Sequence, residues 1–251
     1  MSRALEGKVA VVTGGGRGLG RAMALALAGE GAAVVVTGRT TASLDEVVSE
    51  IEGIDGRALA VACDVTEEAQ VDALVEQALA AFGTVDVLVN NSGVVDTTTL
   101  IDQDPMSWDR VFDTNLRGVY LTSRAFGRVL VEKRAGKVIN IASNFALMGV
   151  SHHVSYSSSK AGVIALTRSL AVEWARHNVQ VNAIAPGYFA TDINAELRDD
   201  DAATDAVLRR SPARRMGRAE ELSPWVLLLA GRASDFMTGE TIVIDGGQSL
   251  Q

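Results

Sequence analysis

The chain has 251 residues, of which 47% are hydrophobic, and this is enough apolar material to fill the core of one large α/β domain. Its formal net charge of −8 argues against a nucleic-acid-binding protein, which would need a basic face to neutralise phosphates. The single cysteine, Cys63, excludes an internal disulfide framework and fits a reducing compartment, where we expect it to be a small core residue.

Short apolar runs rich in β-branched residues alternate with longer amphipathic segments along the chain. In chain order, the first half is predicted to contain strand Val9–Thr13, helix Gly18–Ala28, strand Val34–Thr37, helix Ser43–Ile51, strand Ala58–Cys63, helix Glu67–Phe82 and strand Val87–Asn90. The second half is predicted to contain a helix from about Met106 to Val131, strand Lys137–Ala142, helix Tyr156–Arg176, strand Gln180–Ile184, helix Ala219–Leu229 and strand Thr241–Asp245.

This regular alternation predicts one domain over residues 1–251, a Rossmann-like, doubly wound α/β fold with a seven-stranded parallel sheet and helices on both faces. A charged, irregular segment at about 188–216 interrupts the alternation, and we expect it to be either a solvated insertion or a mobile lid over the substrate. No apolar run approaches the ~18 residues that a membrane span requires, so we expect a cytoplasmic protein.

The first predicted strand runs directly into a glycine-rich stretch. Five of the seven residues from Gly14 to Gly20 are glycine, and the next predicted helix begins inside this stretch. Glycine lets a ligand approach the backbone closely, and a helix N-terminus attracts anions through its free N–H groups and its dipole. The spacing of Thr13, Gly14, Gly18 and Gly20 therefore predicts a dinucleotide pyrophosphate site rather than a merely tight turn.

The second predicted strand ends where an NAD-binding protein usually carries an acidic residue for the ribose 2′-hydroxyl. This chain has Gly38 and Arg39 there, and Arg17 lies inside the glycine loop. Two guanidinium groups without a carboxylate suit a 2′-phosphate, so we favour NADP (NADPH) over NAD. The alternative is that Arg39 is a solvent-facing loop residue.

A second group of candidate residues follows the fifth predicted strand. Tyr156 and Lys160 are four residues apart and share one helix face, where a nearby ammonium favours the phenolate and makes the tyrosine a usable acid or base. Ser143 follows the strand directly, so its hydroxyl could hold a carbonyl oxygen while Tyr156 gives or takes the proton.

The glycine loop and the set of Ser143, Tyr156 and Lys160 together resemble the short-chain dehydrogenase/reductase family over nearly the whole chain. Further matching motifs are Asp64 after the third strand, NNSG at 90–93 where the family usually has NNAG, Asn115 in DTNLRG, PGYFAT at 186–191 and DGG at 245–247. The resemblance implies an NAD(P)-dependent oxidoreductase that transfers a hydride between nicotinamide and a carbonyl or secondary alcohol. It also implies a homotetramer.

The resemblance further implies a role for each residue of the site. Tyr156 would be the acid/base, Ser143 would orient the carbonyl, Lys160 would lower the tyrosine pKa, and Asn115 would help Lys160 hold a proton-relaying water. Asn115 could instead serve in a helix-interior hydrogen bond, and Asp64 as a helix cap near Thr66. We expect the cofactor to be bound by Gly14, Arg17, Gly18, Leu19, Gly20, Arg39, Asp64, Val65, Asn91, Gly93, Tyr156, Lys160, Pro186, Gly187 and Thr191.

No metal is expected, because His152, His153 and His177 lack zinc-ligand partners in the sequence. The adjacent pair, His152 and His153, precedes Tyr156 in a predicted loop at the edge of the pocket. Either one of these histidines contacts the substrate, or both are loop residues without a role in binding.

The sequence from the long helix onward looks most similar to the family branch of gluconate 5-dehydrogenases and keto-sugar-acid reductases. Arg214, Arg215 or Asn194 could bind an anionic substrate of that kind, or could simply be solvated. The main alternative is a 3-oxoacyl-carrier-protein reductase, which usually carries a basic residue where this chain has Val172. An alternative from another class is a non-catalytic NADP-binding sensor, against which the intact catalytic set argues.

Overall fold

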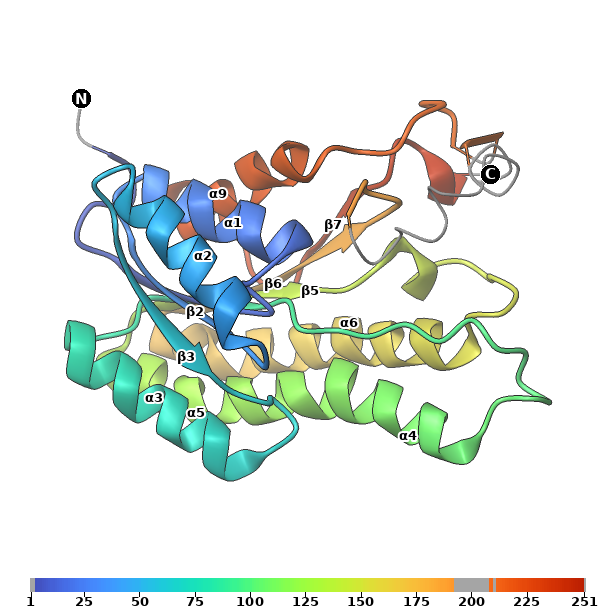
Figure 1. The fold of residues 1–251 in the computed structure, drawn as a ribbon, viewed down its shortest axis with the longest axis horizontal. Coiled ribbons are helices and arrows are strands. Elements are labelled where there is room, and N and C mark those ends of the chain that lie inside the picture. The colour runs from blue at the N-terminus through green and yellow to red at the C-terminus, as the bar shows by residue number, and fades with distance from the viewer. Residues whose placement is uncertain (1–2, 192–207, 210, 251) are drawn as a thin grey trace.

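Seven parallel strands form one sheet at the centre of the molecule in the computed structural model, which describes residues 3–191, 208–209 and 211–250 (Figure 1). The strand order is β3-β2-β1-β4-β5-β6-β7, and every pairing is parallel. The strands are β1 (Val9–Thr13), β2 (Ala33–Gly38), β3 (Arg57–Ala62), β4 (Val87–Asn90), β5 (Gly136–Ile141), β6 (Val179–Pro186) and β7 (Thr241–Ile244). The predicted seven-stranded parallel sheet is therefore confirmed.

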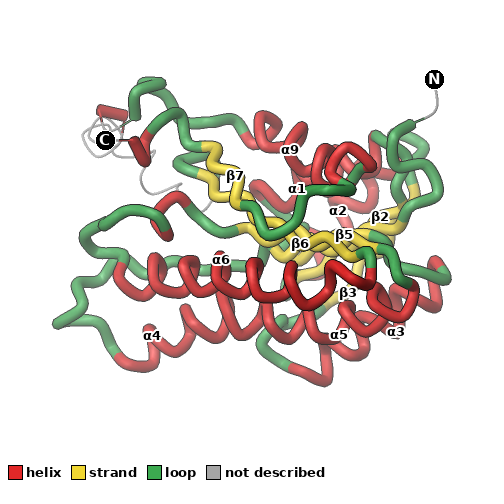
Figure 2. Tube along the Cα trace, turned by 180° about the vertical axis from the view of Figure 1, so that it is seen from behind, coloured by secondary structure: helices red, strands yellow, loops and turns green. Residues whose placement is uncertain are grey.

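Helices cover both faces of this sheet, as the doubly wound prediction requires (Figures 1 and 2). One face carries α1 (Gly18–Gly29), α2 (Thr41–Glu52) and α9 (Ser223–Ala230). The other carries α3 (Glu68–Phe82), α5 (Gly118–Lys133) and α6 (Val154–Trp174), with α4 (Pro105–Phe112) leading into α5.

Burial on both faces explains why the central strands are continuous apolar runs rather than alternating ones. All five residues of β1 are buried, and successive side chains enter opposite cores. Val12 belongs to a core with Leu27 of α1 and Val226 of α9, whereas Val11 belongs to a core with Phe126 of α5 and Trp174 of α6. The sheet is thus fixed between two apolar layers, which leaves its strand ends to build the site.

The helix predicted from about Met106 to Val131 differs from the structure in its middle. It consists of α4, a π-helical segment at Asp113–Arg117, and α5. The Gly118 N–H donates to the carbonyl of Asp113, five residues back, which inserts one extra residue into the turn. The helix predicted at Ala219–Leu229 begins as a 3-10 turn, Ala219–Leu222, before α9.

Most of the predicted lid at about 188–216 lies outside the described residues. Within the described ranges, no helix combines the length and the apolar character that crossing a bilayer demands.

The contact between α5 and α6 generates a test of the packing that holds α6 against the sheet. Gly127→Ala should lower the free energy of unfolding by about 1–3 kcal/mol, because the new Cβ would lie 2.5 Å from the Trp174 ring. Gly29→Ala, near the end of α1, is the matched control, since its Cβ would meet nothing within 4 Å and should not destabilise the protein. Urea unfolding measures both, and equal effects would contradict the packing argument.

Candidate active site

The strand order reverses between β1 and β4, and hydrogen bonds tie the carboxyl ends of these two strands together. The backbone N–H groups of Asn91 and Ser92 donate to Thr13 Oγ1 at 2.9 and 3.0 Å. Asn91 Nδ2 donates to the carbonyl oxygens of Thr13 at 3.0 Å and Gly14 at 3.1 Å. Doubly wound sheets bind ligands in the crevice at such a reversal.

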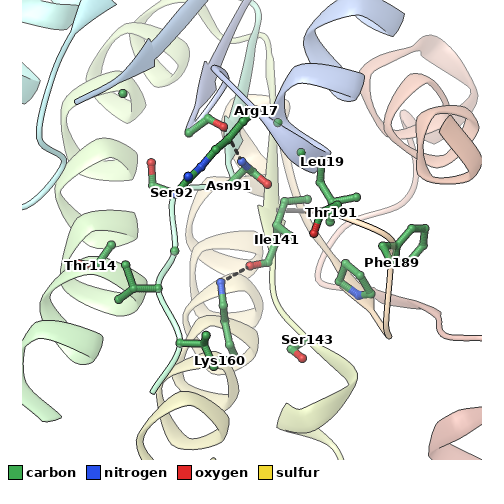
Figure 3. A pocket seen from close by; sticks show the side chains of 18 of the residues that line it. Arg17, Leu19, Asn91, Ser92, Thr114, Ile141, Ser143, Lys160, Phe189 and Thr191 are labelled. Carbon is green, nitrogen blue, oxygen red and sulfur yellow. Dashed lines mark hydrogen bonds between the residues drawn. The ribbon is translucent and has the colours of Figure 1, made fainter. Parts of the chain in front are cut away.

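A cavity of about 430 Å³ lies at this edge of the sheet, lined by the segments that follow β1 to β6 and by residues of α6. Every residue that the sequence predicted to bind the cofactor lies in this lining: Gly14, Arg17, Gly18, Leu19, Gly20, Arg39, Asp64, Val65, Asn91, Gly93, Tyr156, Lys160, Pro186, Gly187 and Thr191. The parallel sheet therefore brings the predicted residues together around one space, part of which Figure 3 shows.

The glycine loop packs closely against the segment that follows β4. A Cβ on Gly20 would lie 2.0 Å from the Gly14 carbonyl oxygen and 2.6 Å from Asn91 Nδ2, so no side chain fits there. Gly14 adopts a left-handed backbone with φ of +62°. Helix α1 begins at Gly18, and its N-cap residue Arg17 makes no side-chain cap. Glycine is thus required by the loop's own packing, and the loop leaves a helix N-terminus without a side-chain cap in the cavity wall, which suits a phosphate.

The part of the cavity that follows β2 is polar and carries no acidic side chain among its described residues. It contains Arg39 with Thr40 and Ser43, and Ser43 Oγ donates to the Thr40 carbonyl at 2.9 Å. Thr40 and Ser43 were not predicted as site residues, although their position just after Arg39 was a usable signal.

Asp64 is the acidic residue of the described cavity lining, and it follows β3. Its Oδ1 accepts hydrogen bonds from the backbone N–H of Thr66 at 3.0 Å and from Thr66 Oγ1 at 2.8 Å. The residue therefore lies in the cavity and also makes the local contact with Thr66 that was considered as an alternative.

The predicted catalytic side chains Ser143, Tyr156 and Lys160 meet in the part of the cavity that follows β5. Lys160 Nζ donates to the carbonyl of Ile141, the last residue of β5, at 2.8 Å (Figure 3). It lies 5.9 Å from the centroid of the Tyr156 ring. Ser143 Oγ accepts a hydrogen bond from the Phe145 N–H at 3.2 Å, which caps the short 3-10 turn Asn144–Ala146.

Burial controls the proton affinities of this group. It raises the pKa of Tyr156, while a hydrogen bond with Ser143 acts in the opposite direction and the neighbouring Tyr188 adds to the rise. Burial also lowers the pKa of Lys160 to about 8. The expectation that Lys160 lowers the tyrosine pKa stays a prediction: burial is the largest influence on the phenol in this structure, and Lys160 Nζ donates to the Ile141 carbonyl.

Asn115 does not line the cavity, although its neighbour Thr114 does. Its fully buried side chain accepts from the Val94 N–H at 2.8 Å and donates to the Val94 carbonyl at 2.9 Å and to Ser159 Oγ at 3.1 Å. These bonds are not the helix-interior bond considered as the alternative, because they join the π-helical segment to the segment after β4 and to α6. A role for Asn115 in proton relay stays a prediction.

An aromatic wall, defined here as Phe145, His153, Tyr156 and Tyr188, borders the catalytic side chains. Phe145 makes edge contacts with the other three rings, with centroids separated by 4.9 Å from His153, 6.3 Å from Tyr156 and 5.6 Å from Tyr188. Of the histidine pair, His153 lines the cavity, whereas His152 is exposed and does not. Neither Phe145 nor Tyr188 was predicted as a site residue, although Tyr188 lies within the PGYFAT motif at 186–191.

The arginines considered for substrate binding do not line this cavity. Arg214 Nη1 donates to the Arg209 carbonyl at 3.0 Å, and both terminal nitrogens of Arg215 bind the Glu221 carboxylate at 2.7 Å. Asn194 lies outside the described residues.

Cys63 is confirmed as a core residue, since it is buried and its surroundings raise the pKa of its thiol to about 11, chiefly by desolvation. The described part of the chain contains no group of three or more His, Cys, Asp or Glu that could hold a metal ion.

Comparison with known proteins identifies several close relatives of this chain. It is 40% identical to 2-dehydro-3-deoxy-D-gluconate 5-dehydrogenase of Escherichia coli over 244 residues, which cover 97% of this chain and 96% of the relative. It is 39% identical to a 3-oxoacyl-[acyl-carrier-protein] reductase of Synechocystis over 249 residues, which cover 98% and 99% of the two chains.

A solved structure, a gluconate 5-dehydrogenase from Burkholderia cenocepacia in complex with NADP and tartrate, matches with a TM-score of 0.95 and 35% identity, covering 100% of this chain and 98% of the other. The family model for short chain dehydrogenases matches residues 8–202. The chain therefore belongs to the short-chain dehydrogenase family and is an oxidoreductase.

Proposed function

We propose that this enzyme transfers a hydride between NADP and the carbonyl or secondary alcohol of a keto-sugar acid, such as the pair gluconate and 5-ketogluconate. The observation that carries the proposal is the joint placement of Ser143, Tyr156 and Lys160 in one cavity with Arg17 and Arg39. The relatives that act on 2-dehydro-3-deoxy-D-gluconate and on gluconate support the substrate class.

The cavity extends across several neighbouring strands of the sheet. Arg39 follows β2 and Ser143 follows β5, and β1 and β4 lie between these strands. Three strand spacings separate the two ends by about 14 Å. In this proposal the glycine loop holds the pyrophosphate, Arg17 and Arg39 hold the 2′-phosphate, and Lys160 binds the nicotinamide ribose. The bound nicotinamide supplies or accepts the hydride.

The side chains of this protein would manage the proton and the carbonyl. The Ser143 hydroxyl donates a hydrogen bond to the substrate oxygen, and Tyr156 gives that oxygen its proton as the carbonyl is reduced. Burial raises the pKa of Tyr156, so the phenol carries the proton that it would give to the carbonyl oxygen. Lys160, with a pKa of about 8, can exchange a proton near neutral pH and so return one to the site.

The charge of the cavity lining supports an anionic substrate. Among its described residues, the side chains that can carry positive charge are Arg17, Arg39, Lys160 and His153. Since the arginines are assigned to the 2′-phosphate and Lys160 to the ribose, we propose that His153 contacts the carboxylate of the sugar acid. Its Nδ1 lies 2.8 Å from the Ser151 carbonyl, and when Nδ1–H donates to that oxygen, Nε2 is left for the substrate and donates to a carboxylate from the doubly protonated ring.

The second candidate is reduction of a 3-oxoacyl group on a carrier protein, which the relative from Synechocystis favours. Val172, at the position where such enzymes usually carry a basic residue, is 83% exposed on α6. An exposed valine offers no charge to an acidic carrier, so we rank this function second. A non-catalytic sensor is not retained, since the family is one of oxidoreductases. A single domain, a homotetramer and a cytoplasmic location stay predictions.

Initial rates against a panel of carbonyl compounds test the substrate class. With NADPH we expect turnover of 5-ketogluconate or another keto-sugar acid, and weaker or no turnover of simple diketones and of a β-ketoacyl thioester. Tyr156→Phe should lower kcat at least about 100-fold, because it removes the proton donor. Turnover of the thioester alone would replace the proposed substrate with the second candidate.

Arg39→Asp tests the cofactor preference. We expect KM for NADPH to rise about tenfold or more while KM for NADH changes little, because the change removes a charge-assisted contact to the 2′-phosphate and adds repulsion. Arg232→Asp is the matched control, since Arg232 is exposed, lies outside the cavity lining and carries the same charge change. Equal losses with both cofactors would remove Arg39 from the 2′-phosphate site.

The lowered pKa of Lys160 predicts a pH-dependent stability. Lys160→Met should raise the free energy of unfolding at pH 7 by about 3 kcal/mol, because the folded protein keeps the Lys160 ammonium protonated although its pKa falls from 10.5 to about 8 on folding. Between these values the unfolded chain binds a proton that the folded chain has lost, so the wild type gains stability relative to the variant as pH rises. Urea unfolding at pH 7 and pH 10 measures this, and a constant difference would contradict it.

A further inference from the structure

Hydrogen bonds connect the short turn that follows β5 to residues that follow β7. The turn begins after Ser143 and carries Phe145, and both side chains line the cavity. Asn144 lies between them and is 1% exposed. Its Nδ2 donates to Gln248 Oε1 at 3.0 Å and to Asp245 Oδ2 at 3.3 Å, so the residue next to Ser143 is bonded to a segment about 100 positions away in the sequence.

The partners of Asn144 are themselves fixed. Asp245 Oδ1 accepts from the Gly247 N–H at 2.9 Å, and its Oδ2 accepts from the Ser249 N–H at 2.7 Å. Burial acts to raise the pKa of Asp245, but the hydrogen bonds from Ser249, Asn144 and Gly247 lower it below its ordinary value, so the carboxylate stays charged. Gln248 is 4% exposed and has little freedom to move.

The same two residues also support the wall of the cavity that follows β6. A Cβ on Gly187 would lie 2.6 Å from Asp245 Cβ and 3.2 Å from Gln248 Oε1, and the Gly187 N–H donates to the Ile244 carbonyl at 2.9 Å. Gly187 lines the cavity, as Asn144 does. Asp245 and Gln248 therefore connect two neighbouring walls and fix the spacing between them.

We propose that Asn144 and Gln248 are positioning residues for Ser143. The bond from Asn144 Nδ2 to Gln248 Oε1 fixes the turn whose preceding hydroxyl must meet the substrate oxygen, and a misplacement of about 1 Å at such a group costs up to about 100-fold in rate. This inference rests on the proposed role of Ser143. In this inference the DGG motif at 245–247 and Gln248, the residue after it, act by positioning Ser143 and not by binding the cofactor.

Gln248→Met tests the inference, because methionine has a similar length and shape but no acceptor for Asn144. With the carbonyl compound that the wild type reduces, we expect kcat to fall about tenfold, while KM for NADPH and the melting temperature stay near the wild-type values. Gln180→Met is the matched control. Gln180 is also buried, but it lies near the start of β6, away from the end of β6 that lines the cavity, so this variant should leave kcat unchanged. Wild-type kcat in Gln248→Met, or an equal fall in both variants, would overturn the inference.

A double variant separates positioning from a general structural effect. If Gln248 acts through Ser143, Ser143→Ala combined with Gln248→Met should have the same kcat as Ser143→Ala alone. Losses that multiply would show that Gln248 acts by another route and would overturn the inference. If Gln248→Met does not fold, Asn144→Leu removes the same hydrogen bond from its other end, together with the bond to Asp245, and its combination with Ser143→Ala is compared in the same way.

The Ser143→Ala variant also distinguishes this inference from the proposed function. Wild-type kcat in Ser143→Ala would refute the proposed role of Ser143 and, with it, the positioning of that residue. A large loss in Ser143→Ala together with full activity in Gln248→Met would leave the proposed chemistry in place and refute the positioning alone.

Discussion

The parallel register of the sheet is the constraint on which the site depends. Because every strand runs in the same direction, the segments after β1 to β6 all emerge at one edge, and residues from Gly14 to Thr191 line one cavity. The hydrogen bonds of Asn91 and Ser92 to Thr13 then join the ends of β1 and β4, where the strand order reverses. No single loop builds this site, and its precision comes from strands buried between two cores.

Much of this arrangement can be predicted from the sequence, because it depends on patterns that act locally. Alternating apolar runs and amphipathic segments predict the fold, and the glycine spacing predicts where a phosphate would lie. Arg39 after β2 and Ser143 after β5 follow from the rule that strand ends face the ligand. The lining of the cavity contains these residues because each is placed by its own strand.

The remaining features depend on contacts between distant segments, which local patterns do not contain. The π-helical turn at Asp113–Arg117 accompanies the bonds of Asn115 to Val94, a residue 21 positions away. The aromatic wall forms because Phe145 and Tyr188 leave neighbouring strands. The direction of the Tyr156 pKa shift depends on burial, which spacing along a helix does not measure.

The burial of Lys160 has a consequence for how such a chain evolves. If Lys160 acts in turnover as proposed, a buried lysine with a lowered pKa persists at this position because turnover is selected, since an apolar residue there would make the fold more stable. In a lineage that no longer needs the reaction, this position should be among the first to drift. Descendants that keep the glycine loop and lose the lysine would then be stable nucleotide-binding proteins without activity.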